Sequence, residues 1–227
     1  MKIRMLTLLV LLVPTVLQAQ TARYPLTTTE GLRPHNVVLE PATLQGKKGL
    51  KVVASQESGQ LAPGVETMVL IDDLEFGDGV IEAEIAGGVR PGAPEGARGF
   101  VGIAFRVQND QRTYDAFYLR PTNGRADDQV RRNHTAQYIS HPDWPWFRLR
   151  KEFPSQYESY VDLVPNTWTK VKIEIQGAQA RFYVHGQKQP TLIVGDVKSG
   201  PNGKGAIALW IDTGTVAHFR NVVVSGK

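Results

Sequence analysis

The sequence predicts an all-β fold in which antiparallel strands form a two-sheet sandwich, and three observations support this class. Apolar and polar residues alternate along several short segments, as they do in strands that bury one face. Glycine and proline, with 22 and 14 copies, interrupt these segments at short intervals. No segment has a convincing helical period, so we expect no long helix. About eleven strands joined by short turns then suit a sandwich or a barrel.

The first nineteen residues are expected to be a signal peptide rather than part of the fold. Lys2 and Arg4 give a positive start, residues 5–17 form an apolar run, and Ala19 ends a small-residue exit. The run is short for a transmembrane span, and no later segment approaches one. A retained N-terminal anchor is the alternative. We therefore expect a secreted or periplasmic protein, with a single domain over residues 20–227.

Composition limits the possible partners of the remaining 208 residues. The chain has no cysteine, so disulfides do not stabilise it. Without Lys2 and Arg4, 24 basic residues face 22 acidic ones, and a net charge of about +2 is too mild to predict nucleic-acid binding. The local charge is more informative, because residues 120–150 contain six arginines, three aspartates and no lysine. This exclusive use of arginine favours planar, bidentate pairing.

The first half of the domain contains five expected strands. Three of them are "KGLKVVAS" (48–55), "ETMVLI" (66–71) and "GVIEAEIAG" (79–87), and the last of these alternates best. Its Ile81, Ala83 and Ile85 point one way, and its two glutamates point the other way. "GGVRPGAPEGARG" (87–99) is a loop. "FVGIAFRV" (100–107) and "TYDAFYLRP" (113–121) then form a hairpin across the turn "NDQ" (109–111).

The second half contains the remaining expected strands. "WFRLR" (146–150) and "YESYVDL" (157–163) follow the arginine-rich stretch. "WTKVKIEIQG" (168–177) alternates cleanly, with Val171, Ile173 and Ile175 inward, and pairs across a Gly-Ala turn with "ARFYVHG" (180–186). "GAIALWID" (205–212) and "VAHFRNVVVS" (216–225) are the last two strands.

The closing strands carry a pattern that resembles a known superfamily. "NTWTKVKIEIQGAQARFYVHG" and "GKGAIALWIDTGTVAHFRNVVV" together give a Trp-led strand, its hairpin partner, a Gly-x-Ile-x-Leu strand and a final "FRNV" strand. This order resembles concanavalin A-like lectin/glucanase domains, most of all the secreted bacterial 3-keto-disaccharide hydrolase-type domains and more loosely the laminin-G-like domains. The pair "GFVGIAFRVQNDQRTYDAFYLR" is similar to theirs as well. The resemblance covers roughly residues 50–224 and implies a jelly-roll sandwich with a carbohydrate-related function.

The chain departs from the catalytic motifs of these families. The hydrolase-type domains usually start the central strand with Asn-Ser-Gly, where this sequence has "GFVGIAF". They usually have Glu-x-Gln on the return strand, where this sequence has "DAFYLR". The Glu-x-Asp-x-x-Glu strand of family 16 glycoside hydrolases is absent too. We therefore carry over no catalytic residue from the resemblance.

Residues that point away from the core on these strands form a candidate ligand surface. If Phe105, Phe117 and Leu209 face the core, strand alternation turns their neighbours to the opposite side. The candidate ligand-binding residues on that side are Arg106, Tyr118, Arg120, Trp210 and Asp212. An aromatic plane stacks on the apolar face of a pyranose, and arginine donates hydrogen bonds to hydroxyl groups in a fixed fork. The alternative is that a loop covers Trp210 and that Arg106 pairs with an acidic residue.

The segment "HPDWPWFRLR" (141–150) adds Trp146 and Arg148 to the candidate ligand-binding residues. Its two prolines make it stiff, so its tryptophans form either an aromatic platform beside the ligand or the small core of a lid. Arg148 and Arg150 bind either a ligand carboxylate or an internal acidic residue. The acidic residues available are Asp127, Asp128, Glu152 and Glu158. We expect the two aspartates to pair with arginines of residues 120–150.

Residue sets for catalysis or metal binding are weak. His134 close to Asp127 or Asp128 is a candidate acid or base. Five scattered histidines lack metal-ligand spacing, and "NDQ" and "RADDQ" do not match a calcium loop. We expect no metal and no cofactor, and the catalytic residues stay unassigned.

Three functions remain open. The first is a carbohydrate-recognising domain without catalysis, with a carbohydrate as its partner. The second is a glycoside hydrolase or lyase of the 3-keto-disaccharide type, and the third is a structural interaction module of the cell envelope. The missing family carboxylates favour the first over the second, and the polar and aromatic middle of the chain favours it over the third.

Overall fold

The computed structural model describes residues 21–55 and 65–226. The expected signal peptide lies outside these residues. The elements are β1 (Thr21–Tyr24), β2 (Leu32–His35), β3 (Val37–Leu44), β4 (Lys47–Ala54), β5 (Thr67–Ile71), β6 (Gly79–Val89), β7 (Val101–Val107), β8 (Tyr114–Leu119), η1 (Pro121–Asn123), α2 (Gln129–Asn133), β9 (Ala136–His141), α3 (Trp146–Glu152), β10 (Glu158–Ser159), β11 (Thr169–Gln176), β12 (Gln179–Val184), β13 (Leu192–Val194), β14 (Ala206–Ile211) and β15 (Thr215–Gly226).

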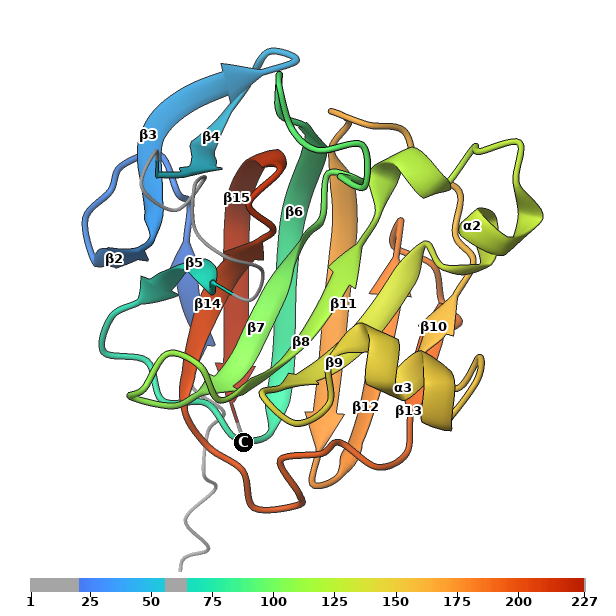
Figure 1. The fold of residues 1–227 in the computed structure, drawn as a ribbon. Helices are drawn as coiled ribbons and strands as arrows, with labels where there is room; N and C mark the ends of the chain where they lie inside the picture. Colours follow the sequence, from blue (N-terminus) through green and yellow to red (C-terminus); the bar gives the residue numbers. More distant parts are fainter. Residues whose placement is uncertain (1–20, 56–64, 227) are drawn as a thin grey trace, which may run out of the picture.

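The strands form two antiparallel sheets packed face to face (Figure 1). Sheet A has the order β13-β12-β11-β6-β15-β4-β3, with β1 also paired to β15. Sheet B has the order β10-β9-β8-β7-β14-β5-β2. The expectation of an all-β, two-sheet jelly-roll sandwich is therefore confirmed.

Alternation places the core as expected. On β11, Val171, Ile173 and Ile175 are buried, and they pair with the inward residues of β6. Aromatic rings join the two sheets, because Phe117 of β8 stacks on Phe182 of β12 with ring centroids 5.1 Å apart. Phe105 of β7 stacks on Phe117 in turn, at 6.1 Å. These contacts identify one face of sheet B as the core face, so the opposite face is the outer one.

Two expected strands are wrong. "WFRLR" is the helix α3, and "YESYVDL" contributes only the two-residue strand β10. Pro145 immediately precedes α3, a position where its fixed φ suits a helix start. A seven-residue segment is too short for its apolar side chains to distinguish the helical period of 3.6 residues from the strand period of two. The strand prediction was therefore wrong here.

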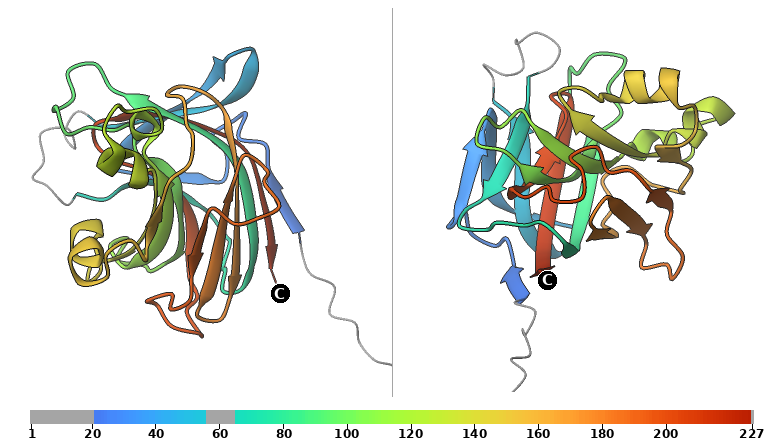
Figure 2. Two further views of the ribbon diagram at one scale, coloured as in Figure 1. Left: turned by 90° about the vertical axis from the view of Figure 1, so that its right-hand side faces the viewer. Right: turned by 90° about the horizontal axis from the view of Figure 1, so that it is seen from below.

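Both helices lie outside sheet B, on the side away from sheet A (Figure 2). η1 and α2 fall in the connection from β8 to β9, and α3 follows β9. The long excursion between β8 and β11 therefore covers part of the outer face of sheet B. Among the described residues, no helix has the length and apolar character needed to span a membrane.

Candidate functional site

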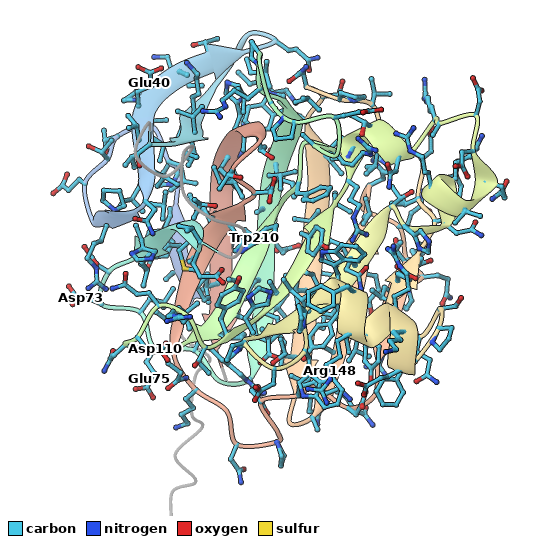
Figure 3. All side chains as sticks on the ribbon, viewed as in Figure 1. Glu40, Asp73, Glu75, Asp110, Arg148 and Trp210 are labelled. Atoms are coloured by element: carbon cyan, nitrogen blue, oxygen red, sulfur yellow. The ribbon has the colours of Figure 1, made fainter. Side chains whose placement is uncertain are left out.

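The outer face of sheet B carries two stacked aromatic rings, Tyr118 of β8 and Trp210 of β14. Gly102 of β7 lies between them in the register, paired with Tyr118 on one side and Trp210 on the other. Because Gly102 has no side chain, the two rings meet above it, with centroids 4.9 Å apart. Figure 3 shows Trp210 near the middle of the molecule in this view. Strand alternation therefore predicted the correct face for both residues.

The expectation that this face is open is wrong at these two residues. Tyr118 is 1% exposed and Trp210 is 8% exposed. Phe100 packs on Tyr118 with ring centroids 5.6 Å apart, and the Trp210 indole N–H donates to the Tyr114 hydroxyl at 3.0 Å. Strand parity fixes the direction of a side chain but not what covers it. The two rings thus form the floor of the candidate site rather than an exposed surface.

Arg120 follows β8 and lies beside Tyr118 as expected, although it is only 4% exposed. Its guanidinium donates to the Tyr118 hydroxyl at 2.7 Å, to Gln137 Oε1 at 3.2 Å and to the His134 carbonyl at 2.9 Å. Burial raises the pKa of Tyr118 to about 12, although the charge of Arg120 acts in the opposite direction. Tyr118 is therefore a neutral hydroxyl at pH 7.

Glu158 joins His134 to Arg150 next to Arg120. One Glu158 oxygen lies 2.8 Å from His134 Nδ1 and 2.9 Å from an Arg150 terminal nitrogen, and Arg150 Nε reaches both oxygens at 3.2 Å. Nδ1 lacks an aligned hydrogen-bond partner, so the contact between His134 and Glu158 is close but is not a well-aligned hydrogen bond. Burial lowers the pKa of His134 below its usual value; Glu158 opposes this effect, and Arg150 and Arg120 reinforce it. His134 is therefore a neutral imidazole at pH 7.

Trp146, the first residue of α3, lies over the side chains of Arg120 and Arg150. It is 41% exposed, and the guanidinium carbons of Arg150 and Arg120 lie 4.8 Å and 5.9 Å from its ring centroid. Cations over an indole face are held by its quadrupole. We call Tyr118, Arg120, His134, Gln137, Trp146, Arg150, Glu158 and Trp210 the Arg120 cluster. Its exposed members form an aromatic and cationic surface above the buried floor.

Arg148 lies outside the Arg120 cluster, at the far side of α3 (Figure 3). It pairs with Glu152 at 2.9 Å, and its guanidinium carbon lies 3.9 Å from the ring centroid of Trp144. Trp144 packs against Phe153 with centroids 5.9 Å apart. The segment therefore contains both expected alternatives, since Trp144 belongs to a small core and Trp146 is exposed.

Arg106 is a correction, because its guanidinium does not reach the outer face. It donates to the Gly77, Gly177 and Gly200 carbonyls at 2.8–3.2 Å, to Ser199, and to Asp78 at 3.1 Å. The register of β7 and β14 shifts between Ala206 and Ala208, and Arg106 has φ +55°. This bulge redirects the side chain. The alternative, pairing with an acidic residue, is confirmed.

Asp212 follows β14 and is partly buried near Tyr118. Its carboxylate accepts from the Gly214 N–H at 3.2 Å. Burial raises the pKa of this carboxyl above its usual value, although backbone N–H groups oppose the shift. Asp212 lies at the margin of the buried floor and does not contact the Arg120 cluster through any recorded hydrogen bond among the described residues.

A second carboxylate–histidine pair, which the sequence analysis did not predict, lies at the other end of the face. Glu66 accepts from the Tyr114 hydroxyl, and its other oxygen lies 2.9 Å from His141 Nδ1. His141 stacks on Tyr114 with centroids 5.1 Å apart. Since the same Tyr114 hydroxyl accepts from Trp210, the pair holds the indole of the floor in place.

The pairing expected for Asp127 and Asp128 is wrong. Asp128 caps α2, where its carboxylate accepts from the Val130 and Arg131 N–H groups. Both aspartates are exposed, and neither forms an ion pair with the described arginines. Arg125 instead binds Asp162 through two hydrogen bonds of 2.8 Å and 2.9 Å. The acidic partners Glu152 and Glu158 are confirmed.

The Arg120 cluster combines a neutral imidazole, two arginines and an exposed indole. The sequence predicted Tyr118, Arg120, Trp146 and Trp210 but missed Gln137 and the contact of His134 with Glu158. β9 carries Gln137 to the site, and His134 lies just before this strand as the C-cap of α2. β9 was not predicted because of its mixed composition. Within residues 21–55 and 65–226, no three acidic or histidine side chains converge into a metal site.

The comparisons with known proteins agree with this fold. Residues 40–225 match the model of the family described as 3-keto-alpha-glucoside-1,2-lyase-like domains. Among curated proteins, none matches the chain.

Several solved structures have the same fold at low identity. Carbohydrate-binding module CBM66 from Bacillus subtilis has 14% identity and a TM-score of 0.57, over 86% of this chain and 96% of the module. A protein of unknown function with a galectin-like fold, also from Bacillus subtilis, has 14% identity and a TM-score of 0.55, over 90% and 94%. Peanut lectin has 9% identity and a TM-score of 0.50, over 92% and 97%. At these identities the similarity establishes the jelly-roll fold alone.

Proposed function

Because the chain belongs to the family of 3-keto-alpha-glucoside-1,2-lyase-like domains, we propose that it cleaves glycosides whose sugar carries a ketone at C3. The reaction is an elimination across C1 and C2. The base removes the C2 proton, and the electron pair enters an enolate on the C3 oxygen. The enolate then re-forms the ketone, C1 and C2 become doubly bonded, and the C1–oxygen bond breaks. The leaving oxygen takes up a proton.

His134 is the proposed base, and its contact with Glu158 is the observation that carries the proposal. A general base works best when it is unprotonated near the operating pH and held in one orientation. Burial keeps His134 neutral, and Glu158 lies 2.8 Å from Nδ1. Glu158 also stabilises the imidazolium that forms when Nε2 accepts the C2 proton.

Trp146 and Arg150 supply the proposed sugar contacts. Trp146 is the exposed aromatic residue of the Arg120 cluster, and Arg150 is held against its ring by the cation–π contact. An exposed indole beside a fixed guanidinium offers stacking and directed hydrogen-bond donors to one sugar ring. The buried rings of Tyr118 and Trp210 support these groups from below.

The state of the carboxylates favours elimination over hydrolysis by paired carboxylates. Such hydrolysis needs two free carboxyl groups about 5–10 Å apart across the scissile bond. In the Arg120 cluster Glu158 is bound by Arg150 and His134, and nearby Asp212 is bound by the Gly214 N–H. Elimination needs one base, for which we propose His134, and an acidified C–H, which the C3 ketone of the substrate supplies at C2.

The test is an activity assay on 3-keto-glucosides with matched histidine variants. We expect the wild type to release the aglycone and an unsaturated keto-sugar, and His134→Gln to lose about 10²–10⁴-fold in rate. His218→Gln is the control, because His218 lies on β15 of the other sheet. No product from the wild type, or full activity of His134→Gln, contradicts the proposal.

Recognition of a carbohydrate without cleavage is the second candidate. The missing family motifs favour it, since the central and return strands lack the Asn-Ser-Gly and Glu-x-Gln motifs that these hydrolase-type domains usually have there. Calorimetry with 3-keto-glucosides separates the two functions. Binding without product formation supports recognition, and product formation supports the lyase.

We also propose that the protein is exported to the periplasm or the medium. The positive start, the apolar run and the small-residue exit of residues 1–19 support this location.

A further inference from the structure

Arg120 is a buried cation whose recorded hydrogen-bond acceptors are all neutral. They are the Tyr118 hydroxyl, the Gln137 side-chain amide oxygen and the His134 backbone carbonyl. Buried charges in proteins are ordinarily paired, because the desolvation of an ion costs several kcal/mol. Arg106, the other nearly fully buried arginine described, follows this rule by pairing with Asp78.

Glu158, the carboxylate whose charge acts on Arg120, does not compensate it. Glu158 is shared by Arg150 and His134. Burial lowers the pKa of Arg120. Repulsion from Arg150 lowers this pKa further, and attraction to Glu158 raises it by less than Arg150 lowers it. The two arginines and Glu158 therefore sum to one positive charge. This charge lies in a region of low polarizability, where its field extends further than in water.

Three aromatic rings surround the Arg120 guanidinium. Its carbon lies 4.9 Å from the Tyr118 ring centroid, 5.3 Å from that of Phe100 and 5.9 Å from that of Trp146. These rings keep water from the charge without neutralising it. The half-buried Arg150 lies beside the same Trp146 ring, at the surface.

We propose that Arg120 and Arg150 form a preorganised site for negative charge on a bound sugar. Arg150 makes the contact, and Arg120 is a positioning residue that raises the positive potential from beneath Trp146 and orients the Tyr118 hydroxyl. If the lyase function proposed above holds, the charge stabilised is that of the enolate on the C3 oxygen. No proton moves to or from either arginine.

Binding of a stable anion tests this proposal without any need for turnover. Gluconate and glucitol form a matched pair, since they differ by a carboxylate in place of a CH₂OH group. We would titrate each by calorimetry into the wild type, Arg120→Gln and Arg120→Lys at low and high salt. Arg125→Gln is the control, because Arg125 is exposed and pairs with Asp162 outside the cluster.

We expect the wild type and Arg125→Gln to bind gluconate at least about tenfold more tightly than glucitol, with a preference that falls as salt rises. Arg120→Gln should lose this preference, and Arg120→Lys should keep most of it. Equal affinity of the wild type for both compounds overturns the proposal, as does an unchanged preference in Arg120→Gln. If Arg120→Gln does not fold, three results decide the question. They are the preference of the wild type for gluconate, the fall of this preference with salt, and its retention in Arg120→Lys.

The outcome is separable from that of the proposed function. A gluconate preference that depends on Arg120, in a protein that does not cleave 3-keto-glucosides, leaves the anion site standing and removes the lyase. Cleavage of 3-keto-glucosides by a protein that shows no preference for gluconate supports the lyase and removes the anion site.

Discussion

Gly102 shows how one missing side chain defines the floor of the site. A Cβ at this position would lie 2.2 Å from the Phe117 carbonyl oxygen and 2.5 Å from the Tyr118 Cβ. Both are far closer than real contacts allow. The stack of Tyr118 on Trp210 therefore depends on glycine at position 102.

Gly102→Ala should lower the free energy of unfolding by about 1–3 kcal/mol, because the strands must separate to admit the methyl group. Urea unfolding measures this loss. Gly96→Ala is the control, since a Cβ there meets no atom within 4 Å. Equal unfolding midpoints for the two variants would show that the floor tolerates the methyl group.

The pH dependence of activity follows from the state of His134. Burial lowers its pKa below the usual 6.5, so the unprotonated base persists to lower pH than an exposed histidine would. For the proposed reaction, kcat/KM should rise with pH through a pKa below 6.5 and stay level above it until another group titrates. A pH–rate profile on a 3-keto-glucoside measures this. A rising limb centred above pH 7 would exclude a buried, neutral His134 as the base.

At the scale of the elements, alternation predicted most strands but not the excursion between β8 and β11. β6, β7, β8, β11, β12, β14 and β15 follow the expected segments within a few residues. In these segments apolar and polar residues alternate over a long enough run to predict a strand. The sequence missed β1, β2, β3, β9 and β13. β9 is buried on both faces and reads "AQYISH", so polar residues such as Gln137 interrupt the pattern.

The candidate site was predicted in part for the same reason. Tyr118 and Trp210 lie on regular strands and Arg120 directly follows β8, so the alternation of side chains along the strand gives their direction. Arg106 lies at a bulge, so the direction that strand alternation predicted for its side chain was wrong. The contact between His134 and Glu158 joins the C-cap of α2 to the first residue of β10, and spacing in the chain does not reveal such a pair.

Lys198 fastens α3 to the loop before β14. Its ammonium lies 4.6 Å from the ring centroid of Trp144, 4.9 Å from that of Phe153 and 5.0 Å from that of Tyr157, and it donates to Asp196 at 2.6 Å. Three rings and a carboxylate around one cation make a cage. The segment that carries Trp146 and Arg150 is therefore anchored at its far side.

Lys198→Ala should loosen α3 without unfolding the sheets. We expect faster amide exchange in residues 144–157 and unchanged exchange in β11, as measured by hydrogen–deuterium exchange with mass spectrometry. Lys188→Ala, at an exposed position, is the control. Unchanged exchange over residues 144–157 would mean that the cage contributes nothing to the position of α3.

At the scale of the whole molecule, both sheets are built without disulfides, so the apolar core between them carries the stability. The core is a continuous set of buried residues contributed by both sheets. The sequence predicted this architecture because a two-sheet sandwich is the usual way to bury one face of each sheet.

Export with removal of residues 1–19 remains a prediction at this scale. Cell fractionation and N-terminal sequencing of the exported protein measure it, and we expect a first residue close to Gln20. Replacing Lys2 and Arg4 by glutamate should retain the protein in the cytoplasm. A mature protein that begins at Met1 would show that the apolar run is kept as an anchor.

The position of β15 has a consequence for how the chain is made. β15 pairs with β1, β4 and β6, and β14 fills the place between β7 and β5. The ribosome therefore synthesises an interior strand of each sheet after the strands on both sides of it. Until β15 has emerged, the edges of β4 and β6 that face it have no strand between them, and the backbone groups on those edges lack partners. We therefore expect this domain of the nascent chain to remain unfolded, and to depend on chaperones, until β15 has been synthesised.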